Sequence, residues 1–331
     1  MNINVFGSTG VIGSKTLKLL KNNFPLIKIN LLSANNNYKK LIQQAIIYKP
    51  KYIYIKNDKQ IEKIKSKIDK KIIIIKESEI FKYLNDSKSD LTILSISGYE
   101  ALYFLKPIIF NTKYLGVVNK ECIVSAGHLI KKLLKRNKTK IFPIDSEHFS
   151  LKKYFDNTYN NIDYNKIYIT ASGGPFYKKK WQNIKNASFK DAINHPKWKM
   201  GYKNSIDSAT LANKCLELVE AHYLFDIPYK KLDILLHPQA LVHSIIDLKN
   251  CTTELNYFYH NMDIPIFNFL NLKKSKSLSN YSLIKNYIFA KNLALEFNLP
   301  NKKQYPILSI FNKINKNDPK ELIKFNIANE F

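Results

Sequence analysis

The feature that most constrains the fold is the alternation of short β-rich runs with stretches of helical character over residues 1–144. Such alternation indicates a parallel sheet with helices on both faces, because parallel strands need long crossover connections. The expected strands are residues 3–6, 28–33, 52–55, 72–75, 91–96, 114–118 and 140–144, and the expected helices are 12–22, 38–48, 59–68, 78–84, 99–110 and 121–136. Functional side chains are expected just after the strands, since open α/β sheets bind ligands at that edge.

The pattern changes in the second half of the chain. A strand near residue 167 runs into a tight turn, and residues 186–206 are irregular. The remaining expectations are a helix at 208–225, antiparallel strands of an α+β domain at 232–238, 240–248 and 252–259, a linker at 271–286, and helices near 306–316 and 319–330. We therefore expect a Rossmann-like parallel-sheet domain (1–144), an α+β domain (145–270), and a linker with a helical region (271–331).

The charge is strongly positive, at +27, but its composition argues against a nucleic-acid partner. Arg136 is the only arginine among 53 basic residues. Arginine is the residue that base and phosphate recognition favours, so this charge indicates a solvated lysine surface that attracts small anions. Nucleic-acid binding stays as an alternative that only the charge suggests.

The cell compartment is expected to be a bacterial cytoplasm. The three cysteines are scattered, which indicates neither a disulfide framework nor a zinc site. No leading segment has the pattern of a signal peptide, and no apolar run approaches the roughly 20 residues that span a bilayer. We expect no membrane partner.

The motif "GSTGVIG" (7–13) follows the first strand and opens a helix. Gly7 permits a tight turn, Gly10 allows close approach of a pyrophosphate, and Gly13 allows the helix to pack against the sheet. The spacing is GxxGxxG rather than the commoner GxGxxG, and a plain turn is the alternative. Its position between a strand and a helix favours dinucleotide binding.

The second strand indicates which dinucleotide. NAD sites usually carry an acid there for the ribose 2′-hydroxyl, but "LLSANNNYKK" (31–40) has none. Asn35, Asn36 and Asn37 could donate to a 2′-phosphate, and Lys39 or Lys40 could supply charge. This favours NADP; the alternative is an asparagine-rich loop of no function.

Three carboxylates suggest a metal site. Asp145 and Glu147 follow the strand at 140–144 and are two residues apart, which in a strand would place them on one side. With Glu217 they would form an all-oxygen site for Mg²⁺ or Mn²⁺, since no cysteine or histidine cluster accompanies them. Salt bridges to nearby lysines are the alternative.

Two further stretches suit an anionic substrate. In "VVNKECIV", Asn119, Lys120 and Glu121 end a strand, and Lys120 could hold a substrate hydroxyl or be a merely exposed lysine. "TASGGPFY" places Ser172 before two glycines, which predicts either an anion nest of backbone N–H groups or a simple glycine turn.

The richest stretch spans residues 193–222. "SIDSAT" predicts a helix start with Ser208 at its anion-friendly end. Asn213 and Glu217 would share one face, with Lys214 beside them. A capped amphipathic helix without a ligand is the alternative.

The loop before that helix has the make-up of a mobile lid at 194–204. It carries His195 and Trp198 near Gly201, so that one aromatic side chain could cover a ligand and exclude water. An ordinary surface loop is the alternative.

Seven motifs in one order resemble the 1-deoxy-D-xylulose 5-phosphate reductoisomerase family: "GSTGVIG", "NKE", "PIDSEH", "SGGPF", "HPKWKMG", "SIDSATLANKCLE" and "HPQALVHS". The resemblance runs from residue 3 to about 270, with a weaker echo in "FNIANE". It implies the rearrangement of 1-deoxy-D-xylulose 5-phosphate and its reduction by NADPH to 2-C-methyl-D-erythritol 4-phosphate, an isoprenoid precursor of the non-mevalonate pathway, in a homodimer.

The resemblance also implies residue roles. The implied cofactor contacts are Ser8, Thr9, Gly10, Val11, Ile12, Asn119, Glu121 and Gly201. The implied metal ligands are Asp145, Glu147 and Glu217. The implied substrate contacts are Lys120, near the reacting oxygens, Ser146, Ser172, His195, Ser208, Asn213 and Lys214, with Trp198 closing the lid.

Three departures from the family pattern stand out. Asn35 and Asn36 replace a glycine and a basic residue of the cofactor loop, which weakens the expected NADP preference. Asp263, in "HNMDIPI", replaces an arginine. Family members continue beyond "NIANEF" through a helical bundle, so we expect apolar surface near 306–331 to be exposed or covered by a partner. The alternatives are a decayed, non-catalytic relative kept as a binding protein and a different NADP-dependent reductase.

Overall fold

The computed structural model describes residues 1–157, 163–194, 196–197, 201–272 and 294–330. It divides into two compact units. The first takes in Met1–Cys122, His128–Ile144 and the segment that begins at Met262. The second takes in Ile123–Gly127, Asp145–Asn261 and the described C-terminal residues.

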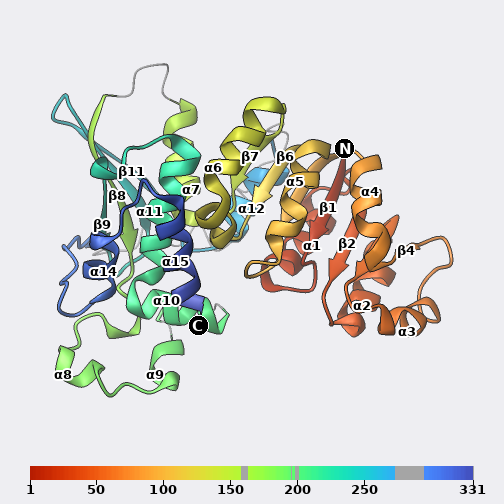
Figure 1. Cartoon of the computed structure of the whole chain (residues 1–331), viewed down its shortest axis with the longest axis horizontal. Coiled ribbons are helices and arrows are strands. Elements are labelled where there is room, and N and C mark those ends of the chain that lie inside the picture. The colour runs from red at the N-terminus through yellow and green to blue at the C-terminus, as the bar shows by residue number, and fades with distance from the viewer. Residues whose placement is uncertain (158–162, 195, 198–200, 273–293, 331) are drawn as a thin grey trace. The chain divides into compact units, whose positions relative to one another are not determined.

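The first unit is built on a seven-stranded sheet in which every neighbouring pair is parallel, in the order β4-β3-β2-β1-β5-β6-β7 (Figure 1). Its strands are β1 (Asn2–Phe6), β2 (Lys28–Ala34), β3 (Tyr52–Ile55), β4 (Ile73–Ile75), β5 (Ser89–Leu94), β6 (Thr112–Val117) and β7 (Lys140–Pro143). Its helices are α1 (Val11–Asn23), α2 (Tyr38–Tyr48), η1 (Asp58–Gln60), α3 (Ile61–Lys65), η2 (Glu77–Glu79), α4 (Ile80–Asp86), α5 (Ala101–Asn111), α6 (Lys120–Arg136, in part) and α12 (Asp263–Leu270). The α/β fold class predicted from the alternation is confirmed.

Strands β1 and β5 lie at the centre of this sheet, where the chain changes direction along it. Ile3, Val5 and Phe6 of β1 are completely buried, as expected for a strand covered on both faces. Ring centroids of Phe6 and Phe104 are 5.4 Å apart, so α5 covers part of the sheet. The change of direction creates a crevice at the carboxyl edge of the strands, where such folds bind ligands.

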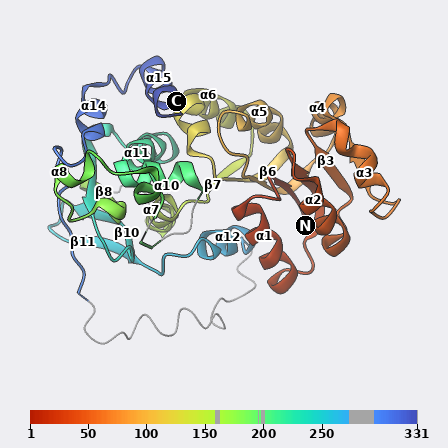
Figure 2. The same cartoon turned by 90° about the horizontal axis from the view of Figure 1, so that it is seen from below.

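Helix α12 belongs to the first unit although it comes late in the sequence. It packs beside α1 (Figure 2), with ring centroids of Phe24 and Phe267 5.0 Å apart. Asp263, one of the departures noted above, pairs with Lys15 at 2.7 Å. This carboxylate therefore has a structural partner on α1.

The second unit contains a four-stranded sheet in the order β11-β10-β8-β9. Its strands are β8 (Tyr164–Ala171), β9 (Leu232–Leu236), β10 (Val242–Leu248) and β11 (Thr253–Tyr257). The antiparallel expectation holds for β10, which runs against β8 and β11, but it is wrong for β9, which is parallel to β8. The helices between β8 and β9 form the long crossover that parallel pairing requires.

Helix α11 is the central helix of the second unit. The helices of this unit are α7 (Ser146–Asn157), η3 (Gly174–Phe176), α8 (Trp181–Ile184), α9 (Phe189–Ile193), α10 (Tyr202–Thr210), α11 (Ala212–Phe225), η4 (Tyr229–Lys231), α14 (Ile307–Lys313) and α15 (Pro319–Glu330). Helix α11 contacts β8, β9, α7 and α14. Because it is enclosed on several sides, most of its residues are buried, including charged ones.

The expected helix at 208–225 is two helices. Leu211 adopts a left-handed conformation (φ 67°) and separates α10 from α11. Ser208 therefore lies in the last turn of α10, and its prediction as the start of a helix is wrong. Leu211 is completely buried, so packing of its side chain offsets a conformation that non-glycine residues disfavour.

Of the helices that the structure describes, none is both long enough and apolar enough to cross a bilayer.

We expect Gly13→Ala to lower the free energy of unfolding by about 1–3 kcal/mol. A Cβ at Gly13 would lie 2.4 Å from Gly7 O and 2.6 Å from Ser8 Cα, so backbone would have to move. Gly10→Ala is the matched control, because its nearest atom would lie at 3.3 Å. Urea unfolding measures both, and equal effects of the two substitutions would contradict the packing argument.

Candidate active site

The loop between β1 and α1 is shaped to receive an anion. Gly7 has a φ of +72°, and a Cβ there would lie 2.5 Å from Ser95 O. Gly10 caps α1 without a side-chain hydrogen bond, and Val11 is 59% exposed. The first N–H groups of α1 are therefore accessible at the positive end of the helix dipole, which suits the pyrophosphate of a dinucleotide.

The side chain of Ser8 points into the protein. Its hydroxyl donates to Gln44 Oε1 (2.8 Å) and Ser33 O (3.0 Å), and Gln44 Nε2 donates to Ser8 O at 2.8 Å. Gln44, on α2, was missed from the sequence, since nothing in its spacing separates it from a surface glutamine. Thr9 and Ile12 are half-buried on either side of Gly10.

The three asparagines after β2 lie at the carboxyl edge of the sheet. Asn37 caps α2, its Oδ1 accepting from the N–H of Lys40 at 3.2 Å. Asn36 Oδ1 accepts from Asn57 Nδ2 at 3.3 Å, and Asn35 is exposed. No acidic residue lies between Ser33 and Lys40 in the sequence, as expected for a site that receives a 2′-phosphate.

Asn119, Lys120 and Glu121 lie at the same edge, after β6. Asn119 caps α6 by accepting from Cys122 N at 2.8 Å, and its Nδ2 donates to Ile96 O (2.7 Å) and Gly98 O (2.8 Å). It thereby fixes the loop that follows β5. Lys120 and Glu121 are half-buried in the first turn of α6.

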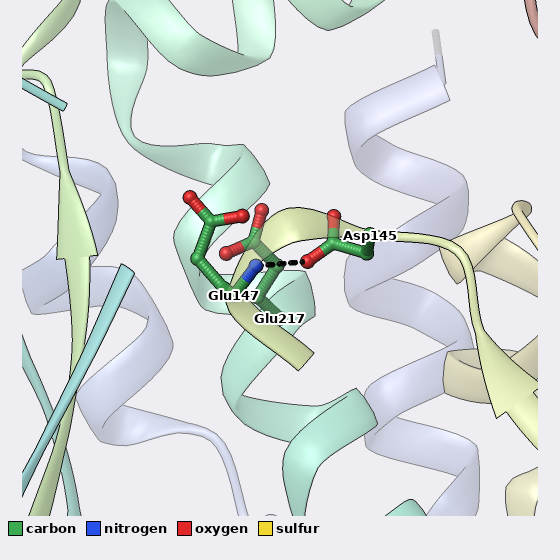
Figure 3. Close-up of side chains that lie close together, drawn as sticks. All are labelled: Asp145, Glu147 and Glu217. Carbon is green, nitrogen blue, oxygen red and sulfur yellow. Dashed lines mark hydrogen bonds between the residues drawn. The ribbon is translucent and has the colours of Figure 1, made fainter. Parts of the chain in front are cut away.

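The carboxylates of Asp145, Glu147 and Glu217 converge in the second unit (Figure 3). One ligand atom from each lies within 4.8 Å of the others, and all three residues are buried. Asp145 precedes α7, and its Oδ1 accepts from the N–H groups of Glu147 (3.1 Å) and His148 (3.2 Å). Asp145 and Glu147 therefore meet at a helix start, not through the alternation of a strand.

Lys214 lies against two of these carboxylates. Its Nζ is 2.6 Å from Glu147 Oε1 and 2.7 Å from Glu217 Oε2. Burial by itself raises the pKa of Glu147, but the Lys214 ammonium outweighs it, and the pKa falls to about 2. Asn213 Nδ2 donates to Glu217, and the Ser146 hydroxyl donates to Glu147.

His148 connects the acidic residues behind the cluster. Its Nδ1 is 3.0 Å from Asp145 Oδ1 and 3.3 Å from Glu220 Oε2, and its Nε2 is 3.0 Å from Glu217 O. Burial lowers the pKa of His148, but the charges of Glu220 and Asp145 outweigh it and raise the pKa to about 9. The imidazolium then donates from both nitrogens.

His148 and Glu220 were both missed from the sequence. A signal existed: His148 directly follows Glu147, and Glu220 is three residues from Glu217 and so lies on the same helical face.

The described side chains fit a divalent cation. Around this centre the carboxylates of Asp145, Glu147, Glu217 and Glu220 meet the cations of Lys214 and His148. The four carboxylates outnumber these two cations, and like charges gathered away from water repel one another unless a further cation lies between them. Carboxylate oxygens are the ligands that Mg²⁺ and Mn²⁺ prefer.

The remaining predicted substrate residues lie around the turn after β8. Gly173 (φ 82°) and Gly174 (φ 64°) place Ser172 beside the end of α10, where a Cβ on Gly174 would lie 2.9 Å from Ser208 O. A cavity of about 550 Å³ borders this turn, and its lining includes Ser172, Lys178, Lys179, Asn194 and Lys197, with Asp191 and Glu296.

The expected lid is only partly within the described residues. His195 and Trp198 lie outside them, as does most of the expected linker. Gly201 is exposed and caps α10.

The fold and these two sites define an α/β enzyme that binds a dinucleotide and a divalent cation. The model of 1-deoxy-D-xylulose 5-phosphate reductoisomerase matches residues 3–127, and the model of the C-terminal domain of that enzyme matches residues 141–225. The chain belongs to the 1-deoxy-D-xylulose 5-phosphate reductoisomerase family.

Known members of the family are similar over most of the chain. The enzyme of Pelagibacter ubique is 39% identical over 96% of this chain and 81% of its own length. The apicoplastic enzyme of Plasmodium falciparum is 33% identical over 94% of this chain and 67% of its own length.

Solved structures agree with this assignment. A reductoisomerase complex with NADPH, fosmidomycin and magnesium has a TM-score of 0.89 and 27% identity, covering 100% of this chain and 83% of that one. The Zymomonas mobilis enzyme with NADPH has a TM-score of 0.88 and 29% identity, covering 99% of this chain and 84% of that one.

We expect the stabilising effect of His148 to depend on pH in metal-free protein. Its folded pKa is raised to about 9, so the contribution is fully present below its ordinary pKa of 6.5 and is lost as the pH rises through 9. The difference in unfolding free energy between wild type and His148→Gln should shrink by about 3 kcal/mol between about pH 6 and about pH 10. Urea unfolding in EDTA measures this, and a difference that stays constant with pH would contradict it.

Proposed function

We propose that the acidic centre of Asp145, Glu147 and Glu217 holds the divalent cation with which this chain acts as a 1-deoxy-D-xylulose 5-phosphate reductoisomerase. Membership in the family gives the activity: NADPH- and metal-dependent conversion of the keto-sugar phosphate in the non-mevalonate pathway. The observation that carries the assignment of this site is the buried convergence of three carboxylates from α7 and α11.

The cation, when bound, would polarise adjacent substrate oxygens and stabilise the negative charge that forms on them as a carbon–carbon bond breaks and re-forms. The protein residues position that chemistry. Asn213 and Ser146 orient Glu217 and Glu147, and His148 orients Asp145. Lys214 holds the carboxylates ionised and offers its ammonium to substrate hydroxyls, and we assign Lys120 to the reacting oxygens.

We assign the cavity beside Ser172 to the phosphate end of the substrate. Lys178, Lys179 and Lys197 supply positive charge there, and Ser172 supplies a hydroxyl. Ser208 lies at the neighbouring end of α10, where its hydroxyl, and not a helix dipole, would bind an anion. Asn194, Pro196 and Lys197 border this cavity. We assign to residues 194–204, which include His195 and Trp198, the lid that closes when the phosphate binds and that protects a reactive aldehyde until hydride arrives.

We assign the NADPH site to the carboxyl edge of the first sheet. Residues 7–12 would receive the pyrophosphate, Asn35, Asn36 and Asn37 would receive the 2′-phosphate end, and Asn119, Glu121 and Gly201 would line the remaining cofactor. The accessible start of α1 supports this assignment.

The assembly is proposed to be a homodimer in the bacterial cytoplasm. β11 is at the edge of its sheet and half-exposes Leu255, which gives a second copy a strand to pair with. None of the three cysteines, Cys122, Cys215 and Cys251, forms a disulfide bond, which is usual in a reducing compartment.

The direct test is the loss of NADPH absorbance when 1-deoxy-D-xylulose 5-phosphate is added with Mg²⁺ or Mn²⁺. We expect turnover that EDTA abolishes and that NADH supports poorly. Folded protein that binds NADPH without turning it over would contradict the activity and favour a non-catalytic relative.

We expect Glu217→Gln to lower kcat by about 100-fold or more, because the neutral amide removes a charge that the cation needs. Binding of Mn²⁺, followed by electron paramagnetic resonance, should weaken in parallel. Glu321→Gln is the matched control, since Glu321 pairs only with Lys324 among its described neighbours, on the surface. Unchanged Mn²⁺ affinity in Glu217→Gln would exclude this residue as a ligand.

A further inference from the structure

We propose that Lys40 is the cation by which this chain selects NADPH over NADH, through the 2′-phosphate of the adenosine ribose. The inference rests on the proposed NADPH site and adds to it the residue that recognises the 2′-phosphate. It concerns a lysine that the sequence does not distinguish from its neighbour Lys39.

The 2′-phosphate needs a positive partner that the loop after β2 does not itself provide. NADPH differs from NADH only in this group, which is doubly charged near neutral pH and binds most strongly to charged donors. Between Ser33 and Lys40 the chain carries neither an acid, which would favour NADH, nor a basic residue before Lys39. Asn36 and Asn37 contribute only neutral amides, and both of their Oδ1 atoms already accept hydrogen bonds.

Lys40 is fixed beside the phosphate loop. Its Nζ donates to Thr9 O at 2.8 Å, and its side chain is half-buried. An ammonium has three protons, so this bond leaves it able to donate to a phosphate. Lys40 is in the first turn of α2, the helix that follows β2. Its charge therefore lies between the loop assigned to the pyrophosphate and the strand end assigned to the adenosine ribose.

Gln44 lies one turn further along the same face of α2. It exchanges two hydrogen bonds with Ser8 and thus also holds the phosphate loop. The two residues differ in one respect that matters here: Gln44 is neutral and Lys40 is charged. Substituting each residue in turn therefore distinguishes a residue that only positions the loop from one that recognises a phosphate.

Other lysines of this edge are less suited. Lys39 is exposed, where an ammonium remains hydrated and binds an anion weakly. Lys56, at the end of β3, is paired with Glu100, which neutralises its charge. Lys59 is also exposed.

The experiment measures dissociation constants of NADPH and NADH by fluorescence titration of the full chain without substrate. We expect Lys40→Gln to weaken NADPH binding by about ten-fold or more and NADH binding by less than about two-fold. Lys40→Arg should retain the preference. Lys39→Gln should change neither affinity, and Gln44→Ala should weaken both by a similar factor.

Salt gives a second readout. The NADPH affinity of the wild type should fall more steeply with ionic strength than that of Lys40→Gln, because one charge pair has been removed. Equal weakening of both dinucleotides by Lys40→Gln would overturn the proposal and assign Lys40 to the loop or the pyrophosphate. Unchanged NADPH affinity would also overturn it, while leaving the reductoisomerase function standing. Only a wild type that binds neither dinucleotide would overturn both.

Discussion

The contact between Lys214 and the carboxylates of Glu147 and Glu217 is the interaction on which the second unit depends. It joins α7 to α11 across 67 residues of sequence, inside a region where isolated charges are strongly disfavoured. Removing the lysine would leave carboxylates that must take up protons or bind another cation. The same physics makes the site useful, because a buried centre in which several carboxylates gather attracts a further positive charge.

Much of the fold could be predicted because its signals are local. β-Branched runs and intervening helical stretches predict the parallel sheet, and the glycines around Ser8 predict the loop after β1. The parallel pairing of β9 could not be predicted, since strand direction depends on the length and path of the crossover. Nor could the break at Leu211, because a buried leucine in a left-handed conformation carries none of the signals that glycine or proline would give.

The candidate site divides in the same way. Asp145, Glu147 and the asparagines after β2 are visible as residue types at strand and helix ends, and Glu217 is visible by its spacing of four residues from Asn213. The sequence signal for His148 and Glu220 is weak, because their role comes from the burial of His148 between Asp145 and Glu220, which is a tertiary property. The role of Lys40 could not be predicted for another reason. The chain has 53 basic residues, and only the hydrogen bond to Thr9 O distinguishes this lysine from the others nearby.

The late position of α12 in the sequence affects the order in which the chain can fold during synthesis. Helix α12 covers α1 through Phe267 and the pair of Asp263 with Lys15, yet more than a hundred residues of the second unit are translated between β7 and α12. The sheet of the first unit can assemble on the ribosome well before α12 is made. Until then the apolar side of α1 stays exposed. The N-terminal unit therefore completes its packing only after most of the chain has emerged, and its nascent form is the species most exposed to chaperones and to aggregation.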